Sequence, residues 1–266
     1  MIKLLAIDLD GTLMNSKKQI SKANVEAIHR ARQQGLHVVL VSARSPFGMS
    51  PSLQTLGLDE ILIAYNGAYA LDLPSQKVLI DQPLAREDAH ALVHTFRRHD
   101  LYAGYYAADE WYVEKVCAEM DWEAQSLKRQ PEVVEDLTAR DLPVPHKIIL
   151  IDLEESGRLH ACLKDIREEL SHINAHFSSP RSLEINHERA TKARALEIIA
   201  ERLELQAQEV AAIGDGENDV SMLGYAGMGV AMGNAPSHVQ AAADLTVGSN
   251  DQDGVAQAIA HILQKS

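Results

Sequence analysis

The sequence begins with an apolar segment that runs directly into two carboxylates, Leu4-Leu5-Ala6-Ile7-Asp8-Leu9-Asp10-Gly11-Thr12. Four consecutive apolar residues are typical of a strand that is covered on both faces, as in a parallel sheet. Asp8 therefore stands where a buried strand ends, which is the place where open α/β sheets bind their ligands. Two ionised carboxylates so close together repel each other. We therefore expect one of them to hold a proton, or a cation to lie between them.

Composition excludes several classes of protein. The net charge is -13, from 25 Lys and Arg against 38 Asp and Glu, which disfavours binding to a nucleic-acid backbone. No apolar stretch approaches the roughly 20 residues that span a bilayer, so no membrane association is expected. Two cysteines, Cys117 and Cys162, cannot form a disulfide framework, and the first residues are typical of a strand rather than a signal peptide. We expect a cytoplasmic protein.

Strands and helices alternate regularly at the two ends of the chain but not in its middle. The predicted buried strands of the regular part are 4–7, 37–41, 61–64 and 210–213, with helices between them and a closing helix over 253–263. Residues 83–186 instead indicate an α+β insert, because strand-like and helical segments are segregated there. The predicted fold is an α/β protein with a Rossmann-like parallel sheet, formed by residues 1–82 and 187–266 and interrupted by this insert.

Polar residues follow the apolar strands of the regular part. They are Asp8 with Asp10, Ser42 with Arg44, Asn66, and Asp215 with Asn218 and Asp219. The carboxyl ends of parallel strands lie at one edge of a sheet, so we expect these residues to converge there. Converging carboxylates need a cation, and an all-oxygen ligand set favours Mg²⁺. A calcium EF-hand does not fit, because the sixth position counted from Asp8 is Leu13 and not glycine.

Such a site suits phosphoryl transfer, in which catalysis consists largely of positioning and charge stabilisation. Ser42 can donate a hydrogen bond to a phosphate oxygen. Lys192 lies at the start of a predicted helix, where an anion is favoured, although a solvated surface lysine is an equally good interpretation of its position.

These residues resemble the four motifs of the haloacid dehalogenase superfamily. Asp8-Leu9-Asp10-Gly11-Thr12, Ser42, Lys192 and the segment Gly214-Asp215-Gly216-Glu217-Asn218-Asp219 are similar to its motifs I to IV. Their order, their spacing and the insert between the second and third motifs resemble the Cof-type phosphatase branch, whose insert is a cap of the C2 type. Residues 83–186 are accordingly expected to be a cap domain that determines substrate specificity.

The resemblance implies a two-step, Mg²⁺-dependent phosphatase. Asp8 is the expected nucleophile, which forms an aspartyl-phosphate, and Asp10 the expected acid and base. The expected metal-binding residues are Asp8, Asp10, Asp215, Asn218 and Asp219, with Asp10 contributing its backbone carbonyl. The expected substrate- and phosphate-binding residues are Leu9, Ser42, Ala43, Arg44, Asn66, Lys192 and Asn218.

Three positions leave alternatives open. The second motif is Ser42-Ala43-Arg44 where the family usually has glycine in the middle, and Lys192-Ala193 stands where the family usually has Lys-Gly. Asn66-Gly67 matches an Asn-Gly pair that faces the active site in Cof-type proteins, but a simple turn explains it equally well.

Two alternative functions remain open. A sugar phosphomutase of the same superfamily is the alternative enzyme, and a phosphate-accepting signalling module is the alternative from another class.

The expected partner is a small phosphorylated metabolite, either a sugar phosphate or a phosphorylated cofactor, and the sequence does not identify it. A monomer or a weak homodimer is expected.

Other conspicuous residues favour structural interpretations. His90 and His94 share a helical face but lack a third ligand, the aromatic residues Tyr105, Tyr106, Trp111 and Tyr112 are expected to pack the insert, and Cys117 and Cys162 are expected to act as small hydrophobic residues.

Overall fold

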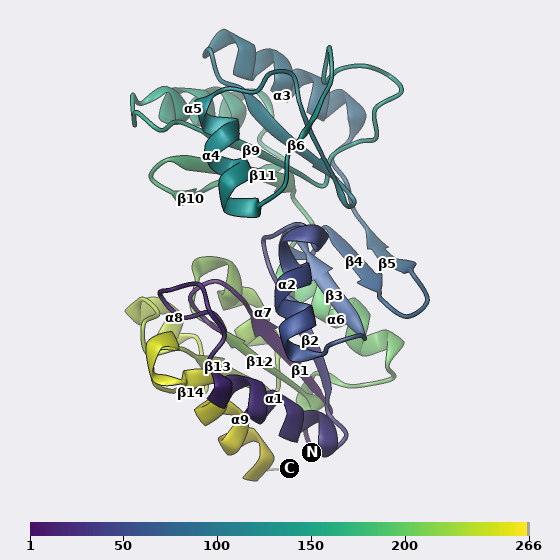
Figure 1. Cartoon of the computed structure of the whole chain (residues 1–266), viewed down its shortest axis with the longest axis vertical. Coiled ribbons are helices and arrows are strands. Elements are labelled where there is room, and N and C mark those ends of the chain that lie inside the picture. The colour runs from purple at the N-terminus through teal and green to yellow at the C-terminus, as the bar shows by residue number, and fades with distance from the viewer. Residues whose placement is uncertain (265–266) are drawn as a thin grey trace. The chain divides into compact units, whose positions relative to one another are not determined.

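The computed structural model describes residues 1–264 and divides into two compact units. The first unit comprises Met1–Ile80 and the chain from Ala190 on, and the second comprises Asp81–Arg189. The expected domain boundaries lie between residues 82 and 83 and between 186 and 187. The last two residues of the expected first domain, 265 and 266, lie outside the described part. Figure 1 shows the elements of each unit, which are described separately below.

The first unit is built on an eight-stranded sheet in the order β14-β13-β12-β1-β2-β3-β4-β5. The strands are β1 (Leu4–Asp8), β2 (His37–Val41), β3 (Ile61–Ala64), β4 (Tyr69–Asp72), β5 (Lys77–Asp81), β12 (Val210–Gly214), β13 (Met228–Ala231) and β14 (Leu245–Thr246). The central strand β1 pairs in parallel with both β2 and β12, so residues about 200 positions apart in sequence become neighbours. The parallel order confirms the predicted α/β class, and the hairpin β4–β5 extends one edge.

Helices of the first unit begin and end where local side chains favour it. They are α1 (Lys22–Gln33), α2 (Pro46–Leu56), α6 (Lys192–Arg202), α7 (Val220–Tyr225), α8 (Ser237–Ala241) and α9 (Gly254–Gln264). The side chain of Thr191 accepts a hydrogen bond from the Arg194 amide and so caps α6, which fixes the position of Lys192 in the first turn. Gly57 ends α2 in a left-handed conformation, as glycine does at many helix ends.

The core of the first unit follows from the apolar strands. Every residue of β1 is buried, and Leu4 and Ala6 pack with residues of α6 such as Leu196 and Ile199. A strand buried on both faces has only its ends available for polar side chains, so Asp8 is the first residue of β1 that can face a ligand.

The second unit has the α+β architecture predicted for the insert. Its sheet has the order β10-β11-β9-β6-β7-β8, with strands β6 (Ala103–Ala107), β7 (Glu110–Val113), β8 (Glu132–Val133), β9 (Lys147–Ile151), β10 (Ile173–Ser179) and β11 (Ser182–His187). The helices are α3 (Arg86–Arg98), α4 (Ala118–Leu127) and α5 (Arg158–Glu169). Buried residues of α3 and α5 pack with Ile148 and Leu150 of β9.

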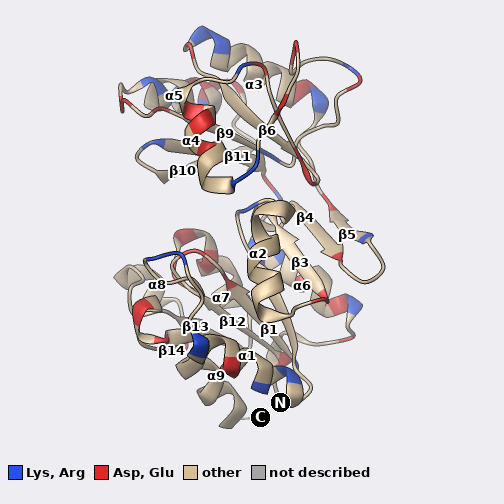
Figure 2. Cartoon of the chain, in the orientation of Figure 1, with Lys and Arg blue, Asp and Glu red and all other residues tan. Residues whose placement is uncertain are grey.

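Charged residues are dispersed along both units. Figure 2 shows lysine and arginine in short, separate segments that alternate with acidic ones. Within residues 1–264, no helix is both long enough and apolar enough to cross a membrane.

Candidate active site

The carboxyl ends of the parallel strands in the first unit bring three predicted residues into direct contact. Lys192 Nζ lies 2.6 Å from Asp8 Oδ1 and 2.5 Å from Asp219 Oδ1. All three side chains are buried, with Lys192 only 1% exposed. The structure therefore brings Lys192 to the two carboxylates and excludes the alternative of a solvated surface lysine.

The pKa values of Asp8 and Lys192 are both raised, for different reasons. Loss of water, followed by the nearby charge of Asp219, raises the pKa of Asp8 well above its usual range. Burial works against the charge of Lys192, but the carboxylates of Asp219 and Asp8 overcome it and raise the pKa of Lys192. The site therefore holds more negative charge than one ammonium group neutralises.

Asp215 extends the acidic cluster. Its Oδ1 accepts a hydrogen bond from the Thr12 hydroxyl at 2.6 Å, and its Oδ2 lies 3.3 Å from Asn234 Nδ2. Burial, with Asp219 contributing, raises the pKa of Asp215 to about 6 although the Thr12 hydrogen bond opposes this. The side chains of Asp8, Asp215 and Asp219 each place a carboxylate oxygen within 4.8 Å of the others.

Asp219 has little capacity left for a metal. Its Oδ2 accepts hydrogen bonds from the backbone N–H groups of Asp215 and Gly216 at 2.9 and 2.8 Å, and its Oδ1 accepts one from Lys192. These contacts fix the loop that follows β12. The carboxylates with the most freedom to bind a cation are then those of Asp8 and Asp215. An all-oxygen set with excess negative charge fits a hard ion such as Mg²⁺.

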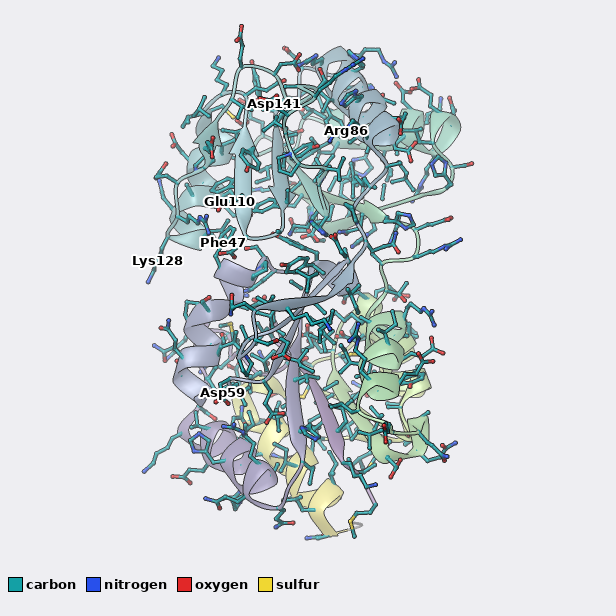
Figure 3. All side chains as sticks on the ribbon, turned by 90° about the vertical axis from the view of Figure 1, so that its right-hand side faces the viewer. Phe47, Asp59, Arg86, Glu110, Lys128 and Asp141 are labelled. Carbon is teal, nitrogen blue, oxygen red and sulfur yellow. The ribbon has the colours of Figure 1, made fainter. Side chains whose placement is uncertain are left out.

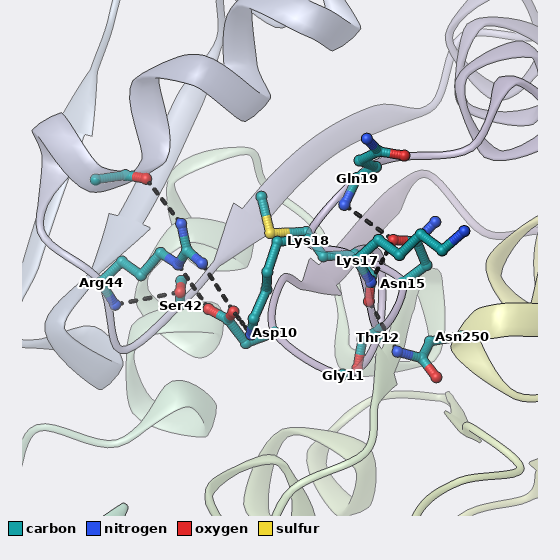
Figure 4. A network of polar contacts seen from close by, with 12 residues as sticks. Asp10, Gly11, Thr12, Asn15, Lys17, Lys18, Gln19, Ser42, Arg44 and Asn250 are labelled. Atoms are coloured by element: carbon teal, nitrogen blue, oxygen red, sulfur yellow. Dashed lines mark hydrogen bonds and ion pairs between the residues drawn. The ribbon is translucent and has the colours of Figure 1, made fainter. Parts of the chain in front are cut away.

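Asp10 lies in a separate network of ion pairs (Figure 4). Arg44 contacts both of its oxygens, with Nε 2.6 Å from Oδ2 and Nη2 2.8 Å from Oδ1, and Lys18 Nζ lies 2.7 Å from Oδ1. Burial opposes ionisation, but the hydrogen bonds from Arg44 and Lys18 prevail and lower the pKa of Asp10 to about 2. Of the two opening carboxylates, Asp10 is thus held as the carboxylate, while the pKa of Asp8 is raised.

Ser42 and Asn66 lie at the ends of the next two strands. Ser42 is buried, and its Oγ accepts a hydrogen bond from the Arg44 amide at 3.2 Å. Asn66 Oδ1 accepts one from Asn218 Nδ2 at 2.9 Å, which links the ends of β3 and β12. Asn66 Nδ2 is buried and has no hydrogen-bond partner.

The Asn66 loop has an unusual backbone. Tyr65, Asn66 and Gly67 all have positive φ, at 53°, 56° and 100°. A Cβ on Gly67 would lie 2.5 Å from the carbonyl oxygen of Thr191, so the loop packs directly against the start of α6. The Asn-Gly pair therefore does more than turn the chain, because it supports the helix turn that carries Lys192.

The other predicted residues are less informative. Leu9 and Ala43 have hydrocarbon side chains and can offer a ligand only backbone groups. His90 and His94 do not belong to the one metal-competent group found among the described residues. Trp111, Tyr105 and Tyr106 are buried, as expected, and so is Cys162.

Three polar residues of the site were not predicted. Thr12 and Asn234 contact Asp215, and Lys18 contacts Asp10. Thr12 is the last residue of the first motif, which was an available signal. Lys18 and Asn234 lie in polar loops, and nothing in the sequence distinguishes them from solvated residues.

A family model described as "haloacid dehalogenase-like hydrolase" matches residues 5–259. The chain belongs to the haloacid dehalogenase-like hydrolases. It is 33% identical over 265 residues to the Bacillus subtilis 5-amino-6-(5-phospho-D-ribitylamino)uracil phosphatase YcsE, with 98% of this chain and 95% of the relative covered. It is 31% identical over 267 residues to the Escherichia coli pyridoxal phosphate phosphatase YbhA, with 97% of each covered.

A solved structure agrees with this assignment. The crystal structure of a haloacid dehalogenase-like hydrolase from Bacteroides thetaiotaomicron has 35% sequence identity and a TM-score of 0.90, covering 98% of this chain and 100% of the other. The predicted resemblance is confirmed, and the chain is a phosphatase of the haloacid dehalogenase family.

Proposed function

We propose that this haloacid dehalogenase-family phosphatase hydrolyses phosphate monoesters of small metabolites through an aspartyl-phosphate on Asp8 and depends on Mg²⁺. The observation that supports this best is the convergence of Asp8, Asp215 and Asp219 around the buried Lys192. A buried carboxylate beside an ammonium group, with further negative charge to be neutralised, suits a nucleophile for phosphorus.

In the first step an Asp8 carboxylate oxygen attacks phosphorus, and the bond from phosphorus to the ester oxygen breaks. The leaving alkoxide takes a proton from Asp10. In the second step water attacks the phosphorus of the aspartyl-phosphate and gives a proton to Asp10, while the bond to Asp8 breaks. Inorganic phosphate leaves, and both carboxyl groups return to their starting states.

The ion pairs of Asp10 affect its proposed role as acid and base. In the structure Arg44 and Lys18 hold Asp10 as a carboxylate, which is the form that activates water. Donation to the leaving group requires protonated Asp10, so when substrate binds these contacts must loosen and Asp10 must take up a proton from solvent, which it returns when the contacts re-form after turnover. Arg44 is suited to transfer its hydrogen bonds to the phosphoryl group, because a guanidinium binds phosphate and carboxylate with similar geometry.

A bound Mg²⁺ would be held by the carboxylates of Asp8 and Asp215 and the backbone carbonyl of Asp10, and it would supply positive charge beside the transferring group. Asp219 and Asn218 support this arrangement through the loop after β12 and the bond to Asn66. Lys192, Ser42 and the unpartnered Asn66 Nδ2 are the side-chain donors proposed for the phosphoryl oxygens. Backbone N–H groups of Leu9 and Ala43 are proposed to assist.

A metal-dependence experiment tests the proposal. Release of p-nitrophenol from p-nitrophenyl phosphate should require added Mg²⁺ and stop with a chelator. Asp215→Asn should raise the Mg²⁺ concentration needed for half-maximal activity at least tenfold, because it removes one of two proposed ligand charges. Asp59→Asn is the matched control, since Asp59 is an exposed carboxylate of the same unit, labelled in Figure 3. Full activity of the protein in chelator, or an unchanged Mg²⁺ requirement for Asp215→Asn, would contradict the proposal.

A further inference from the structure

Three hydrogen bonds join the loop after β1 to the polar segments that follow β13 and β14. They run from Asn234 Nδ2 to the Gly11 carbonyl, from Asn250 Nδ2 to the Met14 carbonyl (Figure 4) and from the Ser16 amide to Asp251 Oδ1, each at 2.9 Å. The bonded residues lie 223 to 236 positions apart in sequence. These two segments therefore hold the loop that begins at Asp10, and the proposed function assigns them no role.

The side-chain amide of Asn234 is fixed in one orientation. Its Oδ1 accepts a hydrogen bond from the Asn250 backbone N–H at 2.9 Å. Its Nδ2 lies 2.9 Å from the Gly11 carbonyl oxygen and 3.3 Å from Asp215 Oδ2. A flipped amide would set its oxygen against these two acceptors and lose all three hydrogen bonds. The Asn250 N–H group thus directs both N–H donors of Asn234 at the loop after β1 and at Asp215.

Neutral groups hold the carboxylate of Asp215 on three sides. The Thr12 hydroxyl donates to Oδ1 at 2.6 Å, and Asn234 donates to Oδ2. Gly11 has a φ of 85°, and a Cβ at this position would overlap Asp215 Oδ2, so the carboxylate lies directly against the glycine backbone. These contacts restrict rotation of the carboxylate without adding a positive charge to it.

Asp215 differs in this respect from its acidic neighbours. Asp8 and Asp219 are paired with Lys192, whereas Asp215 forms no ion pair within residues 1–264. A carboxylate has about four lone-pair positions, and the two neutral donors occupy only two of them. Asp215 therefore keeps its negative charge and has room to bind a cation. Loss of a group that orients a metal ligand in this way typically costs about 10–100-fold in metal affinity.

We propose that Asn234 is a positioning residue for the divalent cation. It holds Asp215 Oδ2 in place while Thr12 holds Oδ1, so that the carboxylate is already ordered when the cation binds and less conformational entropy is lost. Its effect is on metal affinity and not on the attack at phosphorus. The inference rests on the proposed function, because it requires the Mg²⁺ site, and it adds to that site a residue from the segment after β13.

Direct metal binding to the full-length protein, without substrate, tests this role. Mn²⁺ is the probe, because it favours the same oxygen ligands as Mg²⁺ and the free ion is measured by electron paramagnetic resonance. Asn234→Leu removes the donor at similar size and should raise the Mn²⁺ dissociation constant about tenfold. Asn234 is exposed, so the substitution opens no cavity in the core. Gln54→Leu, which removes an exposed amide from α2 of the same unit, is the matched control and should leave the constant unchanged.

The metal dependence of activity separates positioning from structural damage. In Asn234→Leu the Mg²⁺ concentration for half-maximal release of p-nitrophenol should also rise about tenfold, while kcat at saturating Mg²⁺ stays within about threefold of wild type. A damaged fold would lower kcat at every Mg²⁺ concentration. Urea unfolding shows whether the variant is folded, and Asn234→Ala, which also lacks the donor, should behave in the same way.

The outcomes distinguish this inference from the proposed function. Unchanged Mn²⁺ affinity in folded Asn234→Leu and Asn234→Ala would overturn the role of Asn234 alone. So would a loss of kcat at saturating Mg²⁺ with unchanged Mn²⁺ affinity, because Asn234 would then act on the chemical step. Absence of Mn²⁺ binding by the wild-type protein would overturn the proposed metal site and this inference together.

Discussion

Among single side chains, Lys192 is the one on which the proposed catalysis depends most. It is buried and contacts Asp8 and Asp219, and the capped first turn of α6 holds it in place. Its charge offsets two carboxylates that would otherwise face each other without water. The same charge is available to a phosphoryl group bound at Asp8.

Replacing Lys192 tests this role. Lys192→Met should lower phosphate release from p-nitrophenyl phosphate by about 10²–10³-fold, as expected for the loss of one charged donor at a transferring group. Lys22→Met is the matched control, because the Lys22 side chain is 91% exposed on α1, and it should retain full activity. Urea unfolding shows whether Lys192→Met is folded. Near-normal turnover by folded Lys192→Met would show that the ammonium group is not part of the site.

At the scale of the elements, the loop after β3 and the first turn of α6 are packed against each other. Gly67 leaves no room for a Cβ beside Thr191, whereas Gly57, also at positive φ, has no atom within 4 Å of the position of a Cβ. These two glycines separate the cost of backbone conformation from the cost of a steric clash.

We expect Gly57→Ala to lower the free energy of unfolding by about 1–2 kcal/mol, the cost of a left-handed non-glycine residue. Gly67→Ala should lower it by more, and it should also reduce activity, because the clash displaces the turn that carries Lys192. Urea unfolding and phosphate release measure the two effects. Equal destabilisation by the two substitutions would contradict the packing described for Gly67.

In the second unit, His146 bridges the Ala108 amide and the Asp81 carboxylate, and it does so as the neutral imidazole. Its Nδ1 accepts a hydrogen bond from the Ala108 amide at 3.0 Å, so Nε2, which lies 2.8 Å from Asp81 Oδ1, carries the proton. Burial lowers the pKa of His146 below its ordinary value of 6.5 even though Asp81 opposes this. A second proton would have to displace the Ala108 hydrogen bond.

Acidification should destabilise the folded protein through His146. On acidification below pH 6.5 the unfolded chain takes up a proton at this histidine before the folded protein does, so the folded state loses stability. The free energy of unfolding should therefore fall more steeply for wild type than for His146→Gln, which keeps a donor towards Asp81 but does not titrate. Urea unfolding between about pH 7.5 and 5.5 measures this. Parallel curves would contradict it, and His172→Gln, at an exposed site, is the matched control.

At the scale of the whole molecule, the sequence predicts the α/β class and the chemistry at the strand ends because apolar strands and the residues that follow them are local features. Asp8 ends a buried strand and Asp215 directly follows one, so their place in a parallel sheet follows from the pattern. Lys18 and Asn234 were missed because only the folded chain brings their loops to Asp10 and Asp215. Arg44 was predicted to bind phosphate, and its contact with Asp10 depends on a pairing between two loops that no local pattern encodes.

An insert can interrupt the sheet without disturbing the carboxylate cluster, because the cluster belongs to one unit. All contacts among Asp8, Lys192, Asp215 and Asp219 lie within the first unit, on β1, α6 and the loop after β12. The second unit has its own sheet and core, so it can vary without changing these contacts.

The most direct test of the central claim is the rate of phosphate release from p-nitrophenyl phosphate by Asp8→Asn in saturating Mg²⁺. The substitution preserves the shape of the side chain but removes the nucleophilic oxygen charge. Turnover should fall by about 10⁴-fold or more, as for the removal of other covalent nucleophiles, while the protein remains folded. Turnover by folded Asp8→Asn within about tenfold of wild type would contradict the role of Asp8 as the nucleophile.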